Sequence, residues 1–318
     1  MEIAKIKEIS DKIKENIAKV IVGKQDNIDL LLTALIANGH VLLEDVPGTG
    51  KTVLAKSLAR SIAADFKRIQ FTPDLLPSDI TGLNYYNQKQ GEFTFHPGPV
   101  FSNILLADEI NRATPRTQSS LLECMEERQI TIDGKTHRLQ EPFLVIATQN
   151  PVETSGTFPL PEAQMDRFLM QIGMGFPERQ EEIAILNRFM NASPLDELLP
   201  VCKKEELTDM QNSCRSVYVH PSLMEYIIAL VNKTRSQDNI VLGVSPRGSL
   251  AFLRAVQSYA AIKGFSYATP EIIKFLAPYL LSHRLVLRTG YNKTAASREL
   301  IAKILSEVPV PTEIFTKR

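Results

Sequence analysis

A short apolar segment followed by a glycine-rich loop constrains this chain more than any other feature. Residues His40–Ala64 read HVLLEDVPGTGKTVLAKSLARSIAA. The pattern predicts a strand over Val41–Glu44, a loop over Asp45–Gly50 and a helix that begins at Lys51. Glycines allow such a loop to curl so that its backbone N–H groups point inward, and the helix adds unpaired N–H groups and its positive dipole end. The segment therefore predicts a cradle for phosphate groups.

The cradle also carries side chains suited to a nucleoside triphosphate with Mg²⁺. Lys51 can reach the β- and γ-phosphates, and the Thr52 hydroxyl can hold Mg²⁺. The motif G-x-x-x-x-G-K-[ST] begins with glycine, where this chain has Asp45. The alternative is a helix that merely follows a glycine-containing turn, but the order of strand, loop and helix favours an ATP or GTP site. The predicted nucleotide-binding residues of the loop are Val46, Pro47, Gly48, Thr49, Gly50, Lys51, Thr52 and Val53.

A second apolar segment ends in two acids. Asn103–Ala107 reads as a buried strand, and Asp108 and Glu109 follow it directly. In a parallel sheet this places the carboxylates at the edge where the phosphate cradle also opens. Asp108 can complete the Mg²⁺ shell directly or through water, and Glu109 is the candidate general base for an attacking water. The alternative to a catalytic role is that the two acids are simply solvated after a buried strand. The phosphate cradle upstream in the chain favours the catalytic role.

A third apolar strand, over Phe143–Thr148, is followed by Asn150. An amide at this strand end could hold the hydrolytic water against the γ-phosphate. A turn-forming Asn-Pro dipeptide explains the same residue without any catalytic role.

The order of the predicted elements indicates an α/β core followed by helices. Apolar strands with short helices between them continue to residue 177, which predicts a parallel sheet covered on both faces. Beyond it the pattern is helical, and Ser245-Pro246 and Thr269-Pro270 are typical helix starts. We therefore expect an amphipathic helix at 1–20, a nucleotide-binding core at 21–177 and a linker with an all-helical domain at 178–318.

Two hairpins are predicted as insertions in the core. Around residues 81–98, Phe93 and Phe95 alternate with polar residues after a turn-like Lys89-Gln90-Gly91. Around residues 130–139, Asp133-Gly134 separates two alternating segments, which is a strong signal for a tight turn.

Composition limits the class of protein without identifying it. Lys+Arg and Asp+Glu both number 36, so no net positive charge points to nucleic acid as a partner. The three cysteines show no metal-binding spacing and are expected to be free thiols in a reducing compartment. The start of the chain lacks the apolar region of a signal peptide, and the apolar runs are too short for a transmembrane segment. We expect a cytoplasmic protein without metal clusters of His and Cys.

Six segments of this chain occur together, in the same order, in one known family. They read LLEDVPGTGKT, DEINRA, LLECMEERQITIDG, ATQNP, LPEAQMDRF and GVSPRGSL. With the strand ends and the helical C-terminal segment, they resemble the MoxR family of AAA+ ATPases over nearly the whole chain. In this family Glu-Asp stands before Val46, so the missing glycine supports the narrower assignment. The resemblance implies a P-loop NTPase core of the AAA+ type, a smaller all-α lid domain, and ATP and Mg²⁺ as cofactors.

The resemblance also implies roles for individual residues. Asn150 resembles sensor 1, and Ile21, Val22 and Gly23 lie where such proteins hold adenine. Arg167 resembles an arginine finger, which would stabilise charge on the γ-phosphate of a neighbouring subunit. Arg247 resembles sensor 2, which would touch phosphate from the lid.

Several alternatives stay open for these roles. Arg112 and Arg116 also lie near the expected site and are alternatives for the contact to the neighbouring subunit. A surface arginine beside an acid is often only a solvated ion pair. The two hairpins would face the central pore of a ring.

The leading function implied by the resemblance is an ATPase that remodels or activates a partner protein. We expect it to act as a homo-oligomeric ring, with a hexamer as the expected size. That partner would be a client or a separate von Willebrand factor A domain protein, and hydrolysis would move the lid against the core. An AAA+ nucleic-acid motor is one rival, which zero net charge does not favour. A GTP switch lacks the guanine-reading N-K-x-D motif at a strand end, and a nucleotide-binding scaffold without turnover would not need Glu109, Asn150 and Arg167.

Overall fold

The sheet at the centre of the molecule has five parallel strands. The computed structural model describes residues 1–89, 91–150, 156–190, 193–288 and 293–311. The strand order is β2-β5-β8-β1-β9, and every neighbouring pair is parallel. The strands are β1 (Val41–Glu44), β2 (Phe66–Gln70), β5 (Ile104–Asp108), β8 (Leu144–Gln149) and β9 (Met170–Ile172). The predicted α/β class with a parallel sheet is confirmed.

Alternate residues of the central strands pack into two hydrophobic cores, one on each face of the sheet. Leu43 and Ile146 belong to the core that α1, α2 and α3 cover, whereas Leu42 and Val145 belong to the core that α4 and α5 cover. Strands that are apolar at every position are therefore buried on both sides. The helices are α1 (Ile3–Ala18), α2 (Gln25–Ile36), α3 (Lys51–Ser61), α4 (Pro77–Thr81) and α5 (Pro115–Glu127).

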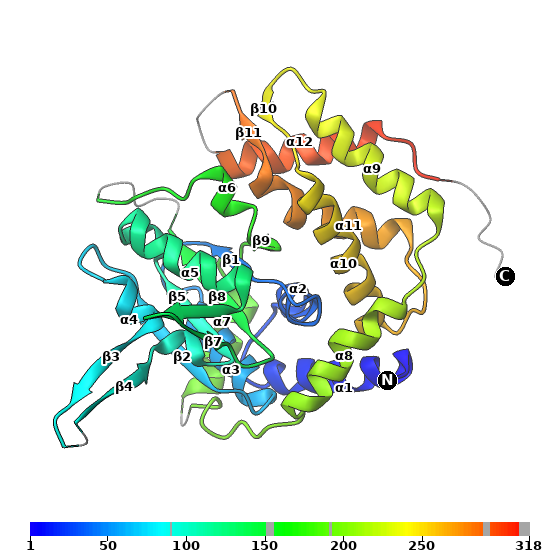
Figure 1. Cartoon of the computed structure of the whole chain (residues 1–318). Helices are drawn as coiled ribbons and strands as arrows, with labels where there is room; N and C mark the ends of the chain where they lie inside the picture. Colours follow the sequence, from blue (N-terminus) through cyan, green and yellow to red (C-terminus); the bar gives the residue numbers. More distant parts are fainter. Residues whose placement is uncertain (90, 151–155, 191–192, 289–292, 312–318) are drawn as a thin grey trace.

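The helices after the sheet form a lid that shares the first of these cores. Helix α10 packs against α1, α2 and α11, and Phe252 of α10 is buried in the same cluster as Ile13 of α1. Figure 1 shows α2 between the sheet and the lid helices. The helices of this region are α8 (Lys204–Ser213), α9 (Pro221–Arg235), α10 (Pro246–Lys263), α11 (Pro270–Leu281) and α12 (Lys293–Glu307). Helix α7 (Arg179–Phe189), which precedes them, has no buried residue and lies beside the core (Figure 1).

The helical C-terminal region is confirmed, and it also contains one short sheet that the sequence analysis did not predict. Strand β10 (Ile240–Leu242) pairs antiparallel with β11 (Val286–Leu287). Two and three residues are too few to establish a period of two, so the pattern gave no signal.

Both predicted hairpins are present, and they contact each other. In β6–β7, Asp133 and Gly134 have φ of 48° and 79°, as a tight primed turn requires. Asn84 Nδ2 donates to Asp133 Oδ2 at 2.7 Å, and the rings of Phe95 and His137 stack with centroids 4.3 Å apart. The hairpin β3–β4 extends outward from the core (Figure 1). The strands are β3 (Gly82–Asn87), β4 (Glu92–Pro97), β6 (Gln129–Ile132) and β7 (Lys135–Arg138).

Short elements complete the described part of the chain. They are α6 (Glu162–Met165) and the 3₁₀ turns η1 (Pro99–Phe101), η2 (Ile110–Arg112), η3 (Cys214–Ser216) and η4 (Ser282–Arg284). Among the helices of the described ranges, none combines the length and the apolar character needed to cross a membrane.

A buried histidine fixes the start of β1. His40 is 3% exposed, and its Nδ1 accepts a hydrogen bond from the Val145 N–H at 3.0 Å. The proton of the neutral ring is therefore on Nε2, which donates to the Met125 carbonyl at 3.0 Å. Burial, and secondly the charge of Arg128, lower the pKa of His40 from 6.5 to about 3. The ring is therefore neutral in the folded chain at neutral pH.

We expect the free energy of unfolding to fall as the pH is lowered from 7.5 to 5. Because the pKa of His40 is lower in the folded than in the unfolded chain, the unfolded chain binds more protons between pH 6.5 and about 3. The stability that neutral His40 provides is complete above pH 6.5, and at pH 5 about 2 kcal/mol of it is lost. Urea unfolding at both pH values measures this. His40→Gln has no titrating group here, so its smaller loss is the control; equal losses would contradict the prediction.

Candidate functional site

Two glycines give the loop between β1 and α3 its shape. φ is 87° at Gly48 and 88° at Gly50, both in the left-handed region. Nothing lies within 4 Å of a Cβ built at Gly48, so glycine is needed there for the backbone conformation and not for space. Gly50 directly precedes α3, whose first N–H groups therefore open into the loop. This is the cradle geometry that the sequence predicted.

Asp45, which replaces the first glycine of the general motif, ties the loop to the end of the core. Its Oδ1 accepts from the Val46 N–H at 2.8 Å. Its Oδ2 accepts from the N–H groups of Met174 and Gly175 at 2.8 Å and 2.6 Å. A glycine could not make these bonds, so the loop is held against the segment after β9 by a charged acceptor. Sequence reasoning noted the departure from the motif but not this contact.

Lys51 points into the loop. Its Nζ donates to the Asp45 carbonyl at 2.8 Å. Burial lowers the pKa of Lys51, and the nearby carboxylates of Asp45, Asp108 and Glu109 oppose that shift without cancelling it. A partly buried ammonium group in this position favours the binding of an anion. Burial removes part of the hydration that stabilises the positive charge, and a bound anion stabilises that charge instead.

The tip of β5 is held by its two neighbouring strands. Asp108 Oδ1 accepts from the Thr148 hydroxyl of β8 at 2.6 Å. Asp108 Oδ2 accepts from Nε and Nη2 of Arg68 on β2, at 3.1 Å and 2.6 Å. Oδ1, which accepts the one bond from Thr148, keeps a further lone pair for a cation or for its bound water, whereas Oδ2 already accepts two bonds. Arg68 was missed by the sequence analysis, although it too lies near a strand end.

Glu109 has an unusual backbone conformation for a residue with a side chain. Its φ is 55°, and its N–H donates to the Thr148 Oγ1 at 2.8 Å. Its carboxylate accepts from Gln70 Nε2 at 2.7 Å and from Arg112 Nη1 at 3.1 Å. A left-handed non-glycine residue is strained, and such strain is found where the surroundings fix a side chain for function. Arg112, an alternative for the contact to a neighbour, thus pairs with Glu109 of its own chain.

These groups line one pocket next to the cradle, with a volume of about 420 Å³. The loop, the tips of β2, β5 and β8, and the first turn of α3 all contribute to it. Nine of the predicted site residues line this pocket, namely Pro47, Gly48, Gly50, Lys51, Thr52, Val53, Asp108, Glu109 and Asn150. The remaining lining residues, which the sequence analysis missed, are Arg68, Gln70 and Thr148.

A second, mostly apolar pocket adjoins the loop on its other side. It shares Gly48, Gly50 and Val53 with the first pocket and is lined by Val22 and Thr49 as predicted. Ile21 lines it as well. The lining residues that were not predicted are Val20, Lys24, Met174, Pro177 and two residues of α7, Ile185 and Phe189.

Two predicted residues of this region line neither pocket. One is Val46, whose N–H donates to Asp45 Oδ1. Gly23 has φ of 70°, and a Cβ there would collide with the Glu181 carboxylate, so its glycine serves the chain turn. The apolar pocket is of the kind that receives a flat, uncharged ring.

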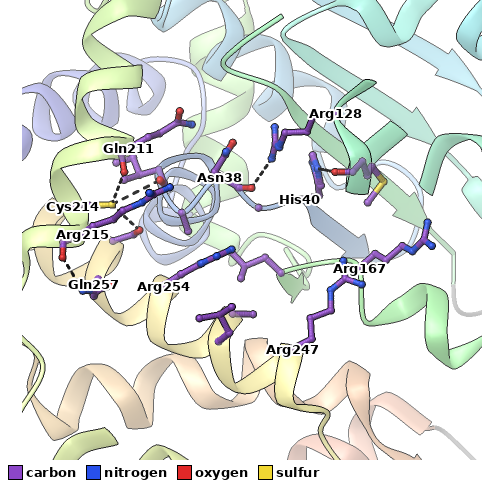
Figure 2. A pocket seen from close by; sticks show the side chains of 18 of the residues that line it. Asn38, His40, Arg128, Arg167, Gln211, Cys214, Arg215, Arg247, Arg254 and Gln257 are labelled. Atoms are coloured by element: carbon purple, nitrogen blue, oxygen red, sulfur yellow. Dashed lines mark hydrogen bonds between the residues drawn. The ribbon is translucent and has the colours of Figure 1, made fainter. Parts of the chain in front are cut away.

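Arg167 and Arg247 lie together, apart from both pockets of the loop. They line a third cavity, of about 360 Å³ between core and lid, together with Arg215 and Arg254 (Figure 2). None of residues 45–53 lines this cavity. Arg247 forms an ion pair with Glu126 of α5. Arg247 therefore lies away from the phosphate site of its own chain, because α10 begins beside α5 and Asp166, and its contact with phosphate stays a prediction.

The arginines of this cavity are short of acidic partners. Within the described ranges, the guanidinium groups of Arg167, Arg215 and Arg254 have no hydrogen bond or ion pair. Arg116 is exposed at the start of α5 and lines none of the three pockets. The cavity therefore offers several unpaired cations in a chain whose net charge is zero.

The residues present fit a nucleoside triphosphate with Mg²⁺. The pocket of the loop joins backbone N–H groups, one ammonium group and two oxygen donors, the Thr52 hydroxyl and the Asp108 carboxylate. Mg²⁺ prefers oxygen ligands and is often held by one or two protein groups, with phosphates and water supplying the rest. In the described part of the chain, no cluster of three or more His, Cys, Asp or Glu side chains could hold a metal ion.

Comparisons with known proteins agree with this geometry. Residues 40–170 match the family model of the ATPase family associated with various cellular activities (AAA), and residues 232–304 match the AAA lid domain. A crystal structure of a proposed ATPase from Cytophaga hutchinsonii superposes with a TM-score of 0.89 and 39% identity, covering 97% of this chain and 96% of that one.

Curated relatives cover almost the whole chain. An uncharacterized protein, YeaC, from Bacillus subtilis is 51% identical over 95% of this chain and 95% of its own length. Chaperone MoxR1 from Mycobacterium tuberculosis is 40% identical over 93% of this chain and 80% of its own length. Protein MoxR from Methylorubrum extorquens is 31% identical over 94% of each. The chain therefore belongs to the MoxR family of AAA+ ATPases and is an enzyme that hydrolyses ATP.

Proposed function

We propose that this chain forms a homo-oligomeric ring, most simply a hexamer, and couples Mg²⁺-dependent ATP hydrolysis to remodelling or activation of partner proteins. The observation that carries the proposal is the separation of two sets of catalytic groups. The loop, Asp108 and Glu109 line one pocket, whereas Arg167 and Arg247 line another. A ring in which one subunit supplies the arginines to the next would join the two sets.

Within one subunit the pocket binds and orients the nucleotide. The loop N–H groups and Lys51 hold the phosphates, the apolar pocket receives adenine, and Thr52 and Asp108 are the ligands that would hold the metal. Mg²⁺, when bound, neutralises charge on the phosphate oxygens. Glu109 accepts a proton from the attacking water, and Asn150 positions that water at the γ-phosphate.

The neighbouring subunit completes the site. Arg167 and Arg247 line a cavity with surplus positive charge, which matches the charge of a triphosphate presented from outside. Their side chains would stabilise charge that develops on the γ-phosphate.

The two hairpins are the parts that we propose act on a partner. Hairpin β6–β7 directly follows α5, and α5 follows the segment Glu109–Arg112, so a change at Glu109 has a short path to the hairpins. Tyr86 and Phe93 on β3–β4 are 54% and 72% exposed, which suits contact with polypeptide. The chaperone name of MoxR1 supports this role.

The partner that we propose is a client protein or a von Willebrand factor A domain protein, and we expect no nucleic acid as a partner. We place the protein in the cytoplasm, and the three buried cysteines, which form no disulfide, agree with a reducing compartment. ATPase activity that is stimulated by DNA and inhibited by salt would instead support a nucleic-acid motor.

Glu109→Gln should abolish turnover while ATP binding remains. The amide keeps hydrogen bonds to Gln70 and Arg112 but cannot accept a proton from water, so we expect a loss of about 10²–10⁴ in kcat. Steady-state hydrolysis and binding of a fluorescent ATP analogue measure the two effects separately. Unchanged turnover would remove Glu109 from the mechanism.

Thr148→Val should lower kcat with little change in ATP affinity. The valine is nearly isosteric, but it loses the donor to Asp108 Oδ1 and the acceptor for the Glu109 N–H, each bond being worth about 1 kcal/mol. Thr148→Ser keeps the hydroxyl and is the matched control. Equal activities of the two variants would show that the hydroxyl does not position the acids.

Arg167→Ala should lower turnover by about 10³ without loss of ATP binding, because an arginine finger acts on the transition state. Arg116→Ala is the control, since that exposed arginine lines none of the three pockets. Mixing Arg167→Ala with Glu109→Gln subunits should restore activity, because intact arginines of one variant then face intact P-loops of the other. A mixture no more active than its parents would exclude action between subunits.

A further inference from the structure

One partly buried carboxylate, that of Asp166, joins the core to the lid close in the chain to both candidate arginines. Asp166 ends the turn after α6 in the core. Its Oδ2 accepts from the hydroxyl of Ser245 at 2.8 Å, and its Oδ1 accepts from Nε of Arg284 at 2.7 Å. Ser245 and Arg284 both belong to the lid. The carboxylate therefore receives one bond from each of two separate lid segments.

Arg284 extends this connection to the core backbone. Its side chain is 2% exposed, and its Nη2 and Nη1 donate to the carbonyls of Phe168 and Leu169, at 2.7 Å and 3.1 Å. Nη1 also donates to the Leu280 carbonyl of α11. Removing a buried arginine from water is costly unless its donors are satisfied, and here the paired carboxylate and these carbonyls satisfy them. The guanidinium thus ties η4 to the segment that leads into β9.

Two of the bonded residues lie close to the candidate arginines in the chain. Asp166 precedes Arg167 in the chain, and Ser245 stands two residues before Arg247. The Ser245 hydroxyl also caps α10 by accepting from the Gly248 N–H at 3.2 Å. A Cβ at Gly248 would lie 3.0 Å from Cδ of Arg284, so the first turn of α10 packs closely on the arginine stem. The backbone at both attachment points is therefore held by the same group of atoms.

We propose that Asp166, with Ser245 and Arg284, is a positioning group that fixes Arg167 of the core and Arg247 of the lid relative to each other for the nucleotide of the next subunit. This inference rests on the proposed ring function and adds to it the residues that prepare the arginines. The side chain of Arg167 has no hydrogen bond or ion pair within the described ranges. Its direction consequently depends on its backbone, which Asp166 anchors.

The physical reason is preorganisation. An arginine that stabilises a transition state contributes fully only when it already points to the charge, and a displacement of about 1 Å can cost about 10² in rate. Arg167 and Arg247 come from two parts of the chain, so their spacing is defined only if these parts are joined. Asp166, Ser245 and Arg284 make that joint a few bonds from both side chains.

Substitutions at Ser245 separate this bridge from simple helix capping. Ser245→Asp keeps a side chain that caps α10 but replaces the donor to Asp166 with a second carboxylate. We expect its kcat to fall about tenfold or more, with unchanged ATP affinity. Ser245→Thr keeps the hydroxyl for both bonds and should retain wild-type kcat. Wild-type kcat in Ser245→Asp would overturn the proposal, because capping alone would then explain the serine.

Mixed rings give a result that a merely structural role could not produce. Asp166→Asn keeps the shape of the side chain but removes the charge that pairs with Arg284, so we expect Arg167 and Arg247 of the variant subunit to be displaced. The P-loop of the same subunit is unchanged. Mixed in equal amounts with Glu109→Gln subunits, which supply well-placed arginines, about a quarter of the interfaces become fully active. We expect activity to rise toward that fraction of the wild-type rate, well above both parents.

The mixture of Arg167→Ala with Glu109→Gln serves as the reference. Recovery in the reference but not with Asp166→Asn would overturn the positioning role and leave the ring function standing. Failure of both mixtures would overturn the action of Arg167 between subunits, and the positioning role with it. Urea unfolding of each variant shows whether a loss of global stability, and not displaced arginines, accounts for a low rate.

Discussion

The parallel pairing of β1, β5 and β8 is the constraint on which the site depends. Parallel strands end at the same edge of the sheet, so whatever follows them is brought together. The P-loop follows β1, Asp108 ends β5 and Asn150 follows β8, and all three contribute to one pocket. The apolar character of these strands on both faces makes this pairing stable, because each face is covered by its own core. Thr148 then adds a direct bond between two of the strand ends.

Hydrophobic packing and buried hydrogen bonds join the lid to the core, in addition to the chain segment that links them. Helix α10 packs on α1 and α2, and these helices lie in the same hydrophobic core as one face of the sheet. A large movement of the lid against the sheet would have to separate this apolar contact and the buried bonds of Arg284. Core and lid are therefore expected to move together when a neighbouring subunit binds at the cavity between them. Movement of one whole subunit against another would leave the contacts between core and lid intact.

Charged and polar side chains hold the parts of the site that the sheet alone leaves loose. Asp45 connects the P-loop to the segment after β9, and Gln70 holds the carboxylate of Glu109. Such contacts are strong because at least one partner is charged and partly shielded from water. These contacts also couple the site to its ligand, because a ligand that binds Lys51 or Glu109 competes with the same hydrogen bonds. The P-loop, the acids and the end of the core thus form one connected set.

The sequence by itself determined the α/β class, the P-loop, the strands that lead to Asp108 and Asn150, both hairpins and most helices of the lid. These features depend on local signals, such as glycine conformations, apolar periodicity and proline at helix starts, which the chain carries whatever its tertiary contacts are. Only the tertiary structure decided that Arg247 lies with Arg167 and not at its own P-loop, that Asp45 binds Met174 and Gly175, and that Arg68 and Gln70 reach the acids. Each of these contacts needs two segments that are far apart in the sequence to pack side by side. The packing of the two hydrophobic cores sets their separation in space, and no spacing of residues along the chain predicts it.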